Sequence, residues 1–223
     1  MRQGIKTVIA MALCAASASL GTSACALTSK ADLVETRYFS PERVKPRLSS
    51  AEQAGAPAAA APRGALELRL GRVSSGPNLR ERIAYRDAAY ELGYYEDLRW
   101  SERPETYVRR ELGRSLFEEH GLQRVLGGVA PTLDVEVIAF DDLRLKSGRA
   151  ARVQLKVLLY EEGRVILEDT LTVDRPVTGD KPKIEDVVAA MAAALDAAAE
   201  QVATAVRGAL VAKRSATPDK AAP

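Results

Sequence analysis

The sequence lacks most of the residues on which enzyme active sites depend. Its 223 residues include one histidine, His120, and two cysteines, Cys14 and Cys25. A zinc or other soft-metal site needs several such ligands, so we expect no metal centre. No G-x-S-x-G, Walker or G-x-G-x-x-G motif is present, so the usual signatures of serine hydrolases, P-loop NTPases and dinucleotide-binding enzymes are missing. We therefore predict a protein that is not an enzyme and that needs no cofactor.

Carboxylate pairs are the remaining catalytic candidates, because a glycosidase works with two carboxyl groups. The pairs Glu118/Glu119, Asp141/Asp142 and Glu161/Glu162 stand at predicted helix ends and turns, where we expect them to be solvated. An envelope hydrolase with scattered carboxylates is the alternative. Two carboxyl groups roughly 5–10 Å apart in one cleft would support it.

The sequence also lacks an excess of basic charge. Its 32 basic residues include Arg2 and Lys6, and without these two they balance the 30 acidic residues. Nucleic-acid-binding proteins usually carry a basic excess or a basic stripe, and neither is visible here. We therefore expect no nucleic-acid partner.

Residues 1–24 are typical of a secretory signal peptide. Arg2 and Lys6 precede a mostly apolar run from Thr7 to Gly21, and small residues follow it. The run is short for a membrane-spanning helix, and an uncleaved N-terminal anchor is the alternative interpretation.

The segment "TSAC", from Thr22 to Cys25, resembles a bacterial lipobox, in which small residues precede a cysteine that is then acylated. Thr22 departs from the leucine that is usual at its position, and cleavage at a conventional small-residue site is the alternative. Acyl chains such as palmitate on Cys25 would anchor the protein durably, because several chains hold a membrane better than one. A mature chain that starts at Cys25 has no second cysteine, so it forms no internal disulfide.

Composition divides the mature chain into three parts. Residues 25–64 are expected to form a lipid-anchored flexible linker, because Ser49 to Gly64 is rich in Ala, Pro and Gly. Within this linker, Val34 to Pro41 is compatible with a short extended piece. Residues 65–210 carry regular apolar patterns and form the predicted domain, and residues 211–223 are expected to be a disordered tail.

Periodicity within residues 65–210 predicts a mixture of strands and helices. Alternating apolar residues predict strands at Leu66–Val73, about Arg82–Arg86 and about Ala89–Tyr95, and then a three-stranded antiparallel meander from Thr132 to Val173. The first predicted helix starts after Ser101 as N-cap and ends at Gly121. A long amphipathic helix is predicted from Lys183 to Leu210. The fold class that follows is α+β, a single domain with an antiparallel sheet and two helices packed on one face.

His120 stands at the end of the first predicted helix. A positive charge is electrostatically favourable there, so we interpret His120 as a structural residue.

Aromatic residues make up 5% of the sequence, yet "YELGYYEDLRW", from Tyr90 to Trp100, holds three of the seven tyrosines and the only tryptophan. Strand alternation places Tyr90 and Tyr94 on one face and Tyr95 on the other. One face then serves the core and the other a partner. Tyr95 is the better candidate for the partner side, because it shares its face with Glu91.

With these segments placed, residues Arg82 to Leu116 resemble the ABC-type transport auxiliary lipoprotein family, including its Pqi-type members. The shared pattern is an Ile/Val-x-Tyr-Arg strand, a strand ending in Tyr-Tyr, an Arg/His-Trp pair, a stretch with proline, and a helix. The resemblance covers roughly Leu66 to Arg207. The long Ala/Pro linker and the imperfect lipobox depart from the family pattern.

The resemblance implies a membrane-anchored periplasmic lipoprotein that is a non-enzymatic accessory component of an ABC/MCE-type system moving phospholipids between the inner and outer membranes. Its partners would be an MCE-domain protein and the ABC permease and ATPase of the same system, and a homo-oligomer is a further implication. Ala26 follows the cysteine, where Asp would favour the inner membrane, so the periplasmic face of the outer membrane is the expected location.

Tyrosine and tryptophan are suited to protein interfaces, so Tyr85, Tyr94, Tyr95 and Trp100 are the predicted partner-interface residues. The alternative is that Tyr90 and Trp100 cover the sheet edge and pack against the first helix. The alternative function is an assembly lipoprotein for an outer-membrane barrel or for lipopolysaccharide export.

Overall fold

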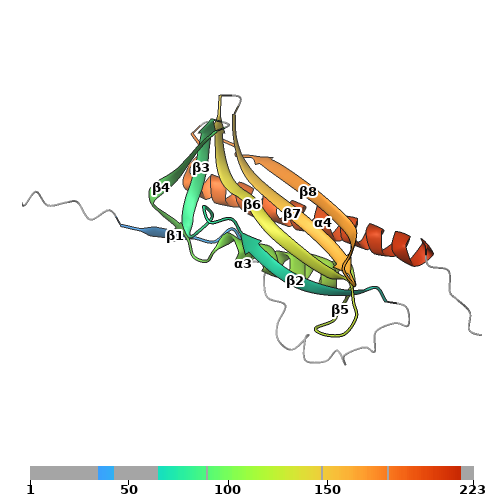
Figure 1. Ribbon diagram of the computed structural model, residues 1–223. Helices are drawn as coiled ribbons and strands as arrows, with labels where there is room; N and C mark the ends of the chain where they lie inside the picture. Colours follow the sequence, from blue (N-terminus) through green and yellow to red (C-terminus); the bar gives the residue numbers. More distant parts are fainter. Residues whose placement is uncertain (1–34, 43–64, 89, 147, 180, 217–223) are drawn as a thin grey trace, which may run out of the picture. The chain divides into compact units, whose positions relative to one another are not determined.

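The structure, a computed structural model, describes residues 35–42, 65–88, 90–146, 148–179 and 181–216. All the helices and strands given below belong to the unit of the chain that starts at Thr36 (Figure 1). The predicted signal peptide, Cys25 and the Ala/Pro-rich part of the predicted linker lie outside the described residues.

The described residues form one eight-stranded sheet, two α-helices and a short π-helix. The strands are β1 Arg37–Phe39, β2 Glu67–Ser75, β3 Arg82–Ala88, β4 Glu91–Trp100, β5 Gln123–Arg124, β6 Thr132–Leu145, β7 Gly148–Glu161 and β8 Arg164–Pro176. The helices are α3 Pro104–Gly113, the π-helix η1 Arg114–Glu119 and α4 Ile184–Ala216. The strand order is β1-β4-β3-β6-β2-β5, and β7 and β8 extend the sheet from β6.

The predicted meander is confirmed, because β6, β7 and β8 pair antiparallel along almost their whole length. Leu133 pairs with Leu159 and Val135 with Val157, so apolar residues meet across the strands. The sheet also contains parallel pairs, which join β1 to β4, β2 to β5, and both β2 and β3 to β6. A period of two identifies a strand but does not specify its neighbour when that neighbour is distant in the chain.

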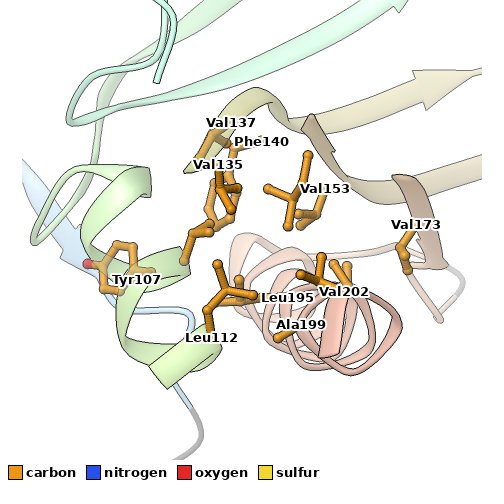
Figure 2. Close-up of a cluster of buried hydrophobic side chains, with 14 of the residues drawn as sticks. Tyr107, Leu112, Val135, Val137, Phe140, Val153, Val173, Leu195, Ala199 and Val202 are labelled. Carbon is orange, nitrogen blue, oxygen red and sulfur yellow. The ribbon is translucent and has the colours of Figure 1, made fainter. Parts of the chain in front are cut away.

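The two α-helices cover one face of the sheet, as the sequence predicts. Helix α4 contacts β7 and β8, and α3 contacts β2, β6 and α4 (Figure 1). Figure 2 shows the core between them, in which side chains of both helices meet those of the sheet: Leu112, Val135, Val137, Phe140, Val153, Leu195, Ala199 and Val202. Each of these side chains is buried, so the hydrophobic effect holds the helices on the sheet.

Helix α4 is rich in alanine, which favours helix and permits close approach to the sheet. In the described part of the chain it is the one helix that is long and apolar enough to cross a membrane, and half of its apolar window is buried in the fold. Its buried residues include Val187, Met191, Leu195 and Val206. That burial is what a core helix of a packed domain requires.

The start of the first helix differs from the prediction. Helix α3 begins at Pro104 with Arg103 as its N-cap, so the prediction that Ser101 caps the helix is wrong. The Tyr107 hydroxyl accepts a hydrogen bond from the Glu102 N–H (2.9 Å) and lies 2.8 Å from the Ser101 Oγ. Ser101 is thus engaged by a side chain from within the helix. The helical segment ends as predicted, since Gly121 has a φ of +65°, a value that favours glycine.

Both ends of the domain extend beyond the boundaries that composition suggested. Strand β1 comes from within the predicted linker and pairs with Leu98–Trp100 of β4. Helix α4 continues to Ala216, beyond residue 210. Its last turn contains Lys213 and Arg214, and basic charge is favourable at a helix C-terminus.

A β-bulge in the middle of β6 reverses the alternation of its side chains. Val137 pairs with Leu155 and Ala139 with Gln154, which leaves Ile138 as an extra residue. Before the bulge, odd-numbered residues such as Val137 face the helices, and after it Phe140 does so (Figure 2). The outer face, opposite the helices, therefore receives Asp141, while Asp142 turns to the helix side.

Candidate functional site

Tyr85 and Tyr95 form an aromatic pair on β3 and β4. Their ring centroids are 5.3 Å apart and the ring planes meet at 71°, a T-shaped arrangement. Tyr85 pairs across the strands with Gly93, and its ring covers this glycine. A Cβ at position 93 would lie only 2.4 Å from the Tyr85 Cζ, so glycine is required for the ring to sit there.

Asp142 joins this aromatic pair to the start of α4. The Tyr95 hydroxyl donates to the Asp142 Oδ2 at 2.6 Å. Arg149 forms a bidentate ion pair with Asp142, in which its Nε donates to Oδ1 (2.9 Å) and its Nη2 donates to Oδ2 (2.7 Å). The Nη1 of Arg149 donates to the carbonyl of Pro182, in the segment that leads into α4. The side chain of Asp142 has no exposed surface, so these partners replace its hydration.

The electrostatics of this arrangement stabilise charged Arg149 and neutral Tyr95. Burial, followed by the hydrogen bond to Asp142, raises the pKa of Tyr95 from its usual value of 10 to about 12. The hydrogen bond from Arg149 to Asp142 raises the pKa of the arginine. At neutral pH the Tyr95 hydroxyl is therefore protonated and donates its hydrogen bond to Asp142.

Arg144 completes the arrangement by stacking on the two tyrosines. Its guanidinium carbon lies 3.5 Å from the Tyr85 ring centroid and 4.7 Å from that of Tyr95. The Arg144 Nε is 3.5 Å from the Asp142 Oδ2 and has no hydrogen-bond partner among the described residues. We call Tyr85, Tyr95, Asp142, Arg144 and Arg149 the tyrosine–arginine cluster.

The other two predicted interface residues lie elsewhere. Tyr94 points to the opposite face of β4, where its hydroxyl donates to the carbonyl of Asn78 at 2.9 Å. Trp100 is 1% exposed and makes T-shaped contacts with the rings of Tyr107 and Phe140. Trp100 thus packs the first helix onto the sheet. Tyr90 is fully exposed at the turn between β3 and β4.

Asp141 and Asp142 are both fully buried, so the expectation that this pair is solvated is wrong. The pair lies inside β6 rather than at a turn, and neither side chain has exposed surface. Asp141 accepts a hydrogen bond from the Arg86 Nε at 2.6 Å. Its Oδ1 has no hydrogen-bond partner among the residues that the structure describes.

The described residues contain no group of three or more His, Cys, Asp or Glu side chains that could hold a metal ion. The Nε2 of His120 lies 2.9 Å from both carboxylate oxygens of Glu200. This contact links the end of η1 to α4, the kind of structural position expected for His120.

Sequence reasoning found the tyrosines of the cluster but missed Asp142, Arg144 and Arg149. The available signal was the pair Asp141–Asp142, which interrupts a segment of otherwise alternating apolar residues. A buried carboxylate needs a cation. The aspartate pair therefore indicates a basic partner such as arginine. The alternation of apolar residues does not, however, predict the bulge that orients the two aspartates.

Taken together, these features define a class of protein, namely an α+β domain with a packed core and a pre-formed cluster of polar and aromatic side chains. The family model described as "ABC-type transport auxiliary lipoprotein component" matches residues 47–203 of the sequence. The match covers more than half of the chain, and the protein belongs to this family. It is therefore an accessory lipoprotein of ABC-type transport, a component of the cell envelope.

Solved structures share the fold. A crystal structure of a protein from Xanthomonas campestris is similar with a TM-score of 0.62 and 22% sequence identity, over 81% of this chain and 100% of that one. A second crystal structure, of an uncharacterized protein, has a TM-score of 0.55 and 17% identity, over 63% of this chain and 92% of that one. No curated protein is significantly similar to the sequence.

Proposed function

We propose that this protein is the lipid-anchored accessory component of an ABC/MCE-type system that moves phospholipids between the inner and outer membranes, and that it has no enzymatic activity. The observation that carries the proposal is membership of the auxiliary lipoprotein family. A transport accessory needs a rigid docking surface rather than a reaction centre. The tyrosine–arginine cluster is consistent with this need, because its polar groups are fixed by Asp142.

Cys25 is the proposed anchor, and Ala26 after it favours the outer membrane over the inner membrane. The strand nearest to the anchor in sequence is β1, whose first residue, Arg37, is 12 residues beyond Cys25. An extended chain spans at most about 3.3–3.6 Å per residue, so a tether of this length reaches roughly 40 Å. The domain would therefore stay close to the membrane that holds its lipid.

The partner-facing surface is proposed at the tyrosine–arginine cluster. Tyr85 and Tyr95 are half-buried, and the Arg144 side chain is 33% exposed, so all three offer surface to a partner. Tyrosine and arginine are, with tryptophan, the residues that are enriched among interface hot spots. Tyr94 is a second candidate on the other face of β4, whereas Trp100 acts indirectly by holding the β4–α3 junction in place.

The proposed partners are the MCE-domain protein, permease and ATPase of one transport system. Co-purification of the tagged full-length lipoprotein from crosslinked cells tests this, together with the phospholipid content of the outer membrane after deletion of the gene. We expect recovery of the MCE-domain protein and an altered outer-membrane phospholipid content. Recovery of an outer-membrane barrel or of lipopolysaccharide-export proteins instead, with unchanged phospholipid, would refute the proposal.

Two arginine variants locate the interface. Arg144→Gln removes the stacked cation but leaves the ion pair of Arg149 with Asp142 intact. Arg175→Gln is the matched control, because Arg175 is an exposed arginine on β8. We expect Arg144→Gln to reduce recovery of the partner about tenfold, in line with the effect of losing a hot-spot residue, and Arg175→Gln to leave it unchanged. Equal recovery with both variants would place the interface elsewhere.

A further inference from the structure

The outer face of the sheet contains a hollow beside the β-bulge of β6. Its volume is about 390 Å³, and three neighbouring strands line it, among others with Arg86 of β3, with Ile138, Ala139, Leu143 and Leu145 of β6, and with Arg152 of β7. The bulge produces the hollow, because it places Ile138 and Ala139 in succession at the same face. Ile138 and Leu145 are 38% and 43% exposed, so these two apolar side chains are open to solvent, while Ala139 and Leu143 form the buried floor of the hollow.

The hollow has two cations and no carboxylate in its lining. An ion pair with a neighbouring aspartate holds each arginine in place. Arg86 donates through Nε to the buried Asp141, and Arg152 forms a bidentate ion pair with Asp174 of β8, at 2.8 and 2.7 Å. Apart from these bonds to Asp141 and Asp174, the guanidinium groups of Arg86 and Arg152 form no hydrogen bond with the described residues, so their remaining N–H groups are available to an anion.

Asp141 holds the guanidinium of Arg86 in position through an ion pair at 2.6 Å. Its side chain is fully buried, and its Oδ1 accepts no hydrogen bond from the described residues. Leaving a buried carboxylate oxygen unpaired is costly, and an apolar residue at this place would avoid the cost. The carboxylate does fix the direction of the Arg86 guanidinium beside an apolar hollow, which is how a binding site keeps a cation aimed at a ligand.

We propose that this hollow binds a single-chain amphiphile with an anionic head group, namely a fatty acid or a lysophospholipid. Arg86 and Arg152 bind the carboxylate or phosphate, and a segment of the acyl chain covers Ile138, Leu143 and Leu145. The volume is at the lower end of the range of small-molecule sites, about 300–1,000 Å³, which suits part of one chain. This inference deepens the proposed lipid-transport function, on which it rests, by giving that function a ligand site.

Photoaffinity labelling of the full-length lipoprotein in phosphatidylcholine vesicles tests the proposal. Three diazirine probes with the same chain are compared: a fatty acid, a lysophosphatidic acid and a neutral monoacylglycerol. Mass spectrometry then locates the labelled peptides. We expect the two anionic probes to label residues 138–145 and the neutral probe to label this segment at least tenfold less. The stronger of the two anionic probes identifies the natural head group as carboxylate or phosphate.

Variants of the two arginines distinguish labelling by a probe bound in the hollow from labelling by a probe that is merely dissolved in the bilayer. Arg152→Gln is expected to lower labelling of 138–145 about tenfold, since one hydrogen bond to a charged group is lost. Lys156→Gln is the matched control, because Lys156 also lies on β7, forms an ion pair with Glu168 of β8 and does not line the hollow. The double variant Arg86→Gln/Asp141→Asn removes the cation and the buried anion together, so the fold is kept while labelling falls.

Equal labelling by the neutral probe, or labelling that is unchanged in Arg152→Gln and in the double variant, would overturn the proposal. The assay contains no transport partner. The labelling experiment therefore tests the ligand site separately from the co-purification experiment, which tests the transport partners. A negative labelling result would reject the ligand site and leave the proposed partners unaffected.

Discussion

Gly93→Ala is the substitution for which the structure gives the clearest quantitative expectation. A Cβ at position 93 would lie 2.4–2.6 Å from two ring carbons and the hydroxyl oxygen of Tyr85. The ring has little freedom to retreat, because the Arg144 guanidinium is 3.5 Å from its centroid and the Tyr95 ring is 5.3 Å away. Either the ring leaves its stack or the strands separate.

The magnitude follows from opposing contributions. Overpacking of this kind costs about 1–3 kcal/mol, and losing the exposed cation–π contact costs about 0.5–1 kcal/mol. Replacing glycine by alanine reduces the entropy of the unfolded chain, which stabilises the folded state by about 0.4–1 kcal/mol. We therefore expect Gly93→Ala to lower the free energy of unfolding by about 2 kcal/mol, as measured by urea unfolding followed by circular dichroism.

A double-mutant cycle with Tyr85→Ala isolates the cause. Without the ring, position 93 has room for a Cβ, so Gly93→Ala should be neutral or slightly stabilising in that background. Gly208→Ala is the control, because no atom lies within 4 Å of the added Cβ on helix α4, and it should stabilise by about 0.5–1 kcal/mol. If Gly93→Ala costs the same with and without Tyr85, the explanation by ring overlap is refuted.

Three further outcomes are expected. Asp142→Asn should lower the free energy of unfolding by about 3 kcal/mol, because it breaks a buried ion pair and leaves Arg149 without its anion; a loss below about 1 kcal/mol in urea unfolding would contradict this. Since the folded-state pKa of Tyr95 is raised from 10 to about 12, the stability it contributes is intact below pH 10 and is lost as the pH rises from 10 to 12. Tyr95→Phe should flatten that decline when urea unfolding is compared at pH 9 and pH 11. Cys25→Ala should move the protein from the membrane to the soluble fraction on fractionation, and a variant that stays with the membrane would identify the N-terminal segment as an uncleaved anchor.

The sequence predicts those elements of the fold that short-range periodicity specifies. Leu133, Val135 and Val137 alternate with charged residues, and a one-residue slip would bury those charges, so the meander follows from the pattern. The stripe of apolar residues on α4 likewise predicts that this face of the helix is buried against the sheet. The parallel partners of β6 are not predictable in this way, because no local pattern records which distant strand will lie beside it.

The candidate site shows the same division. Its aromatic residues are visible as an excess in a sequence poor in aromatics, and Tyr85 and Tyr95 do meet. The arginines that contact these tyrosines, Arg144 and Arg149, come from β6 and β7, more than 45 residues further along the chain. No sequence pattern near the tyrosines predicts these two arginines. The pairing of β3 with β6 brings them together.

The order of the strands and helices and the family resemblance centred on Arg82 to Leu116 depend on residue type and short-range spacing, so the sequence alone is sufficient to predict them. The burial of Asp141 and Asp142, and the fact that Asp142 rather than Asp141 faces the helices, are visible only in the folded domain. Neighbouring strand residues always face opposite sides, but the extra residue at Ile138 decides which one faces which side, because a bulge reverses the side-chain alternation of every residue that follows in the strand.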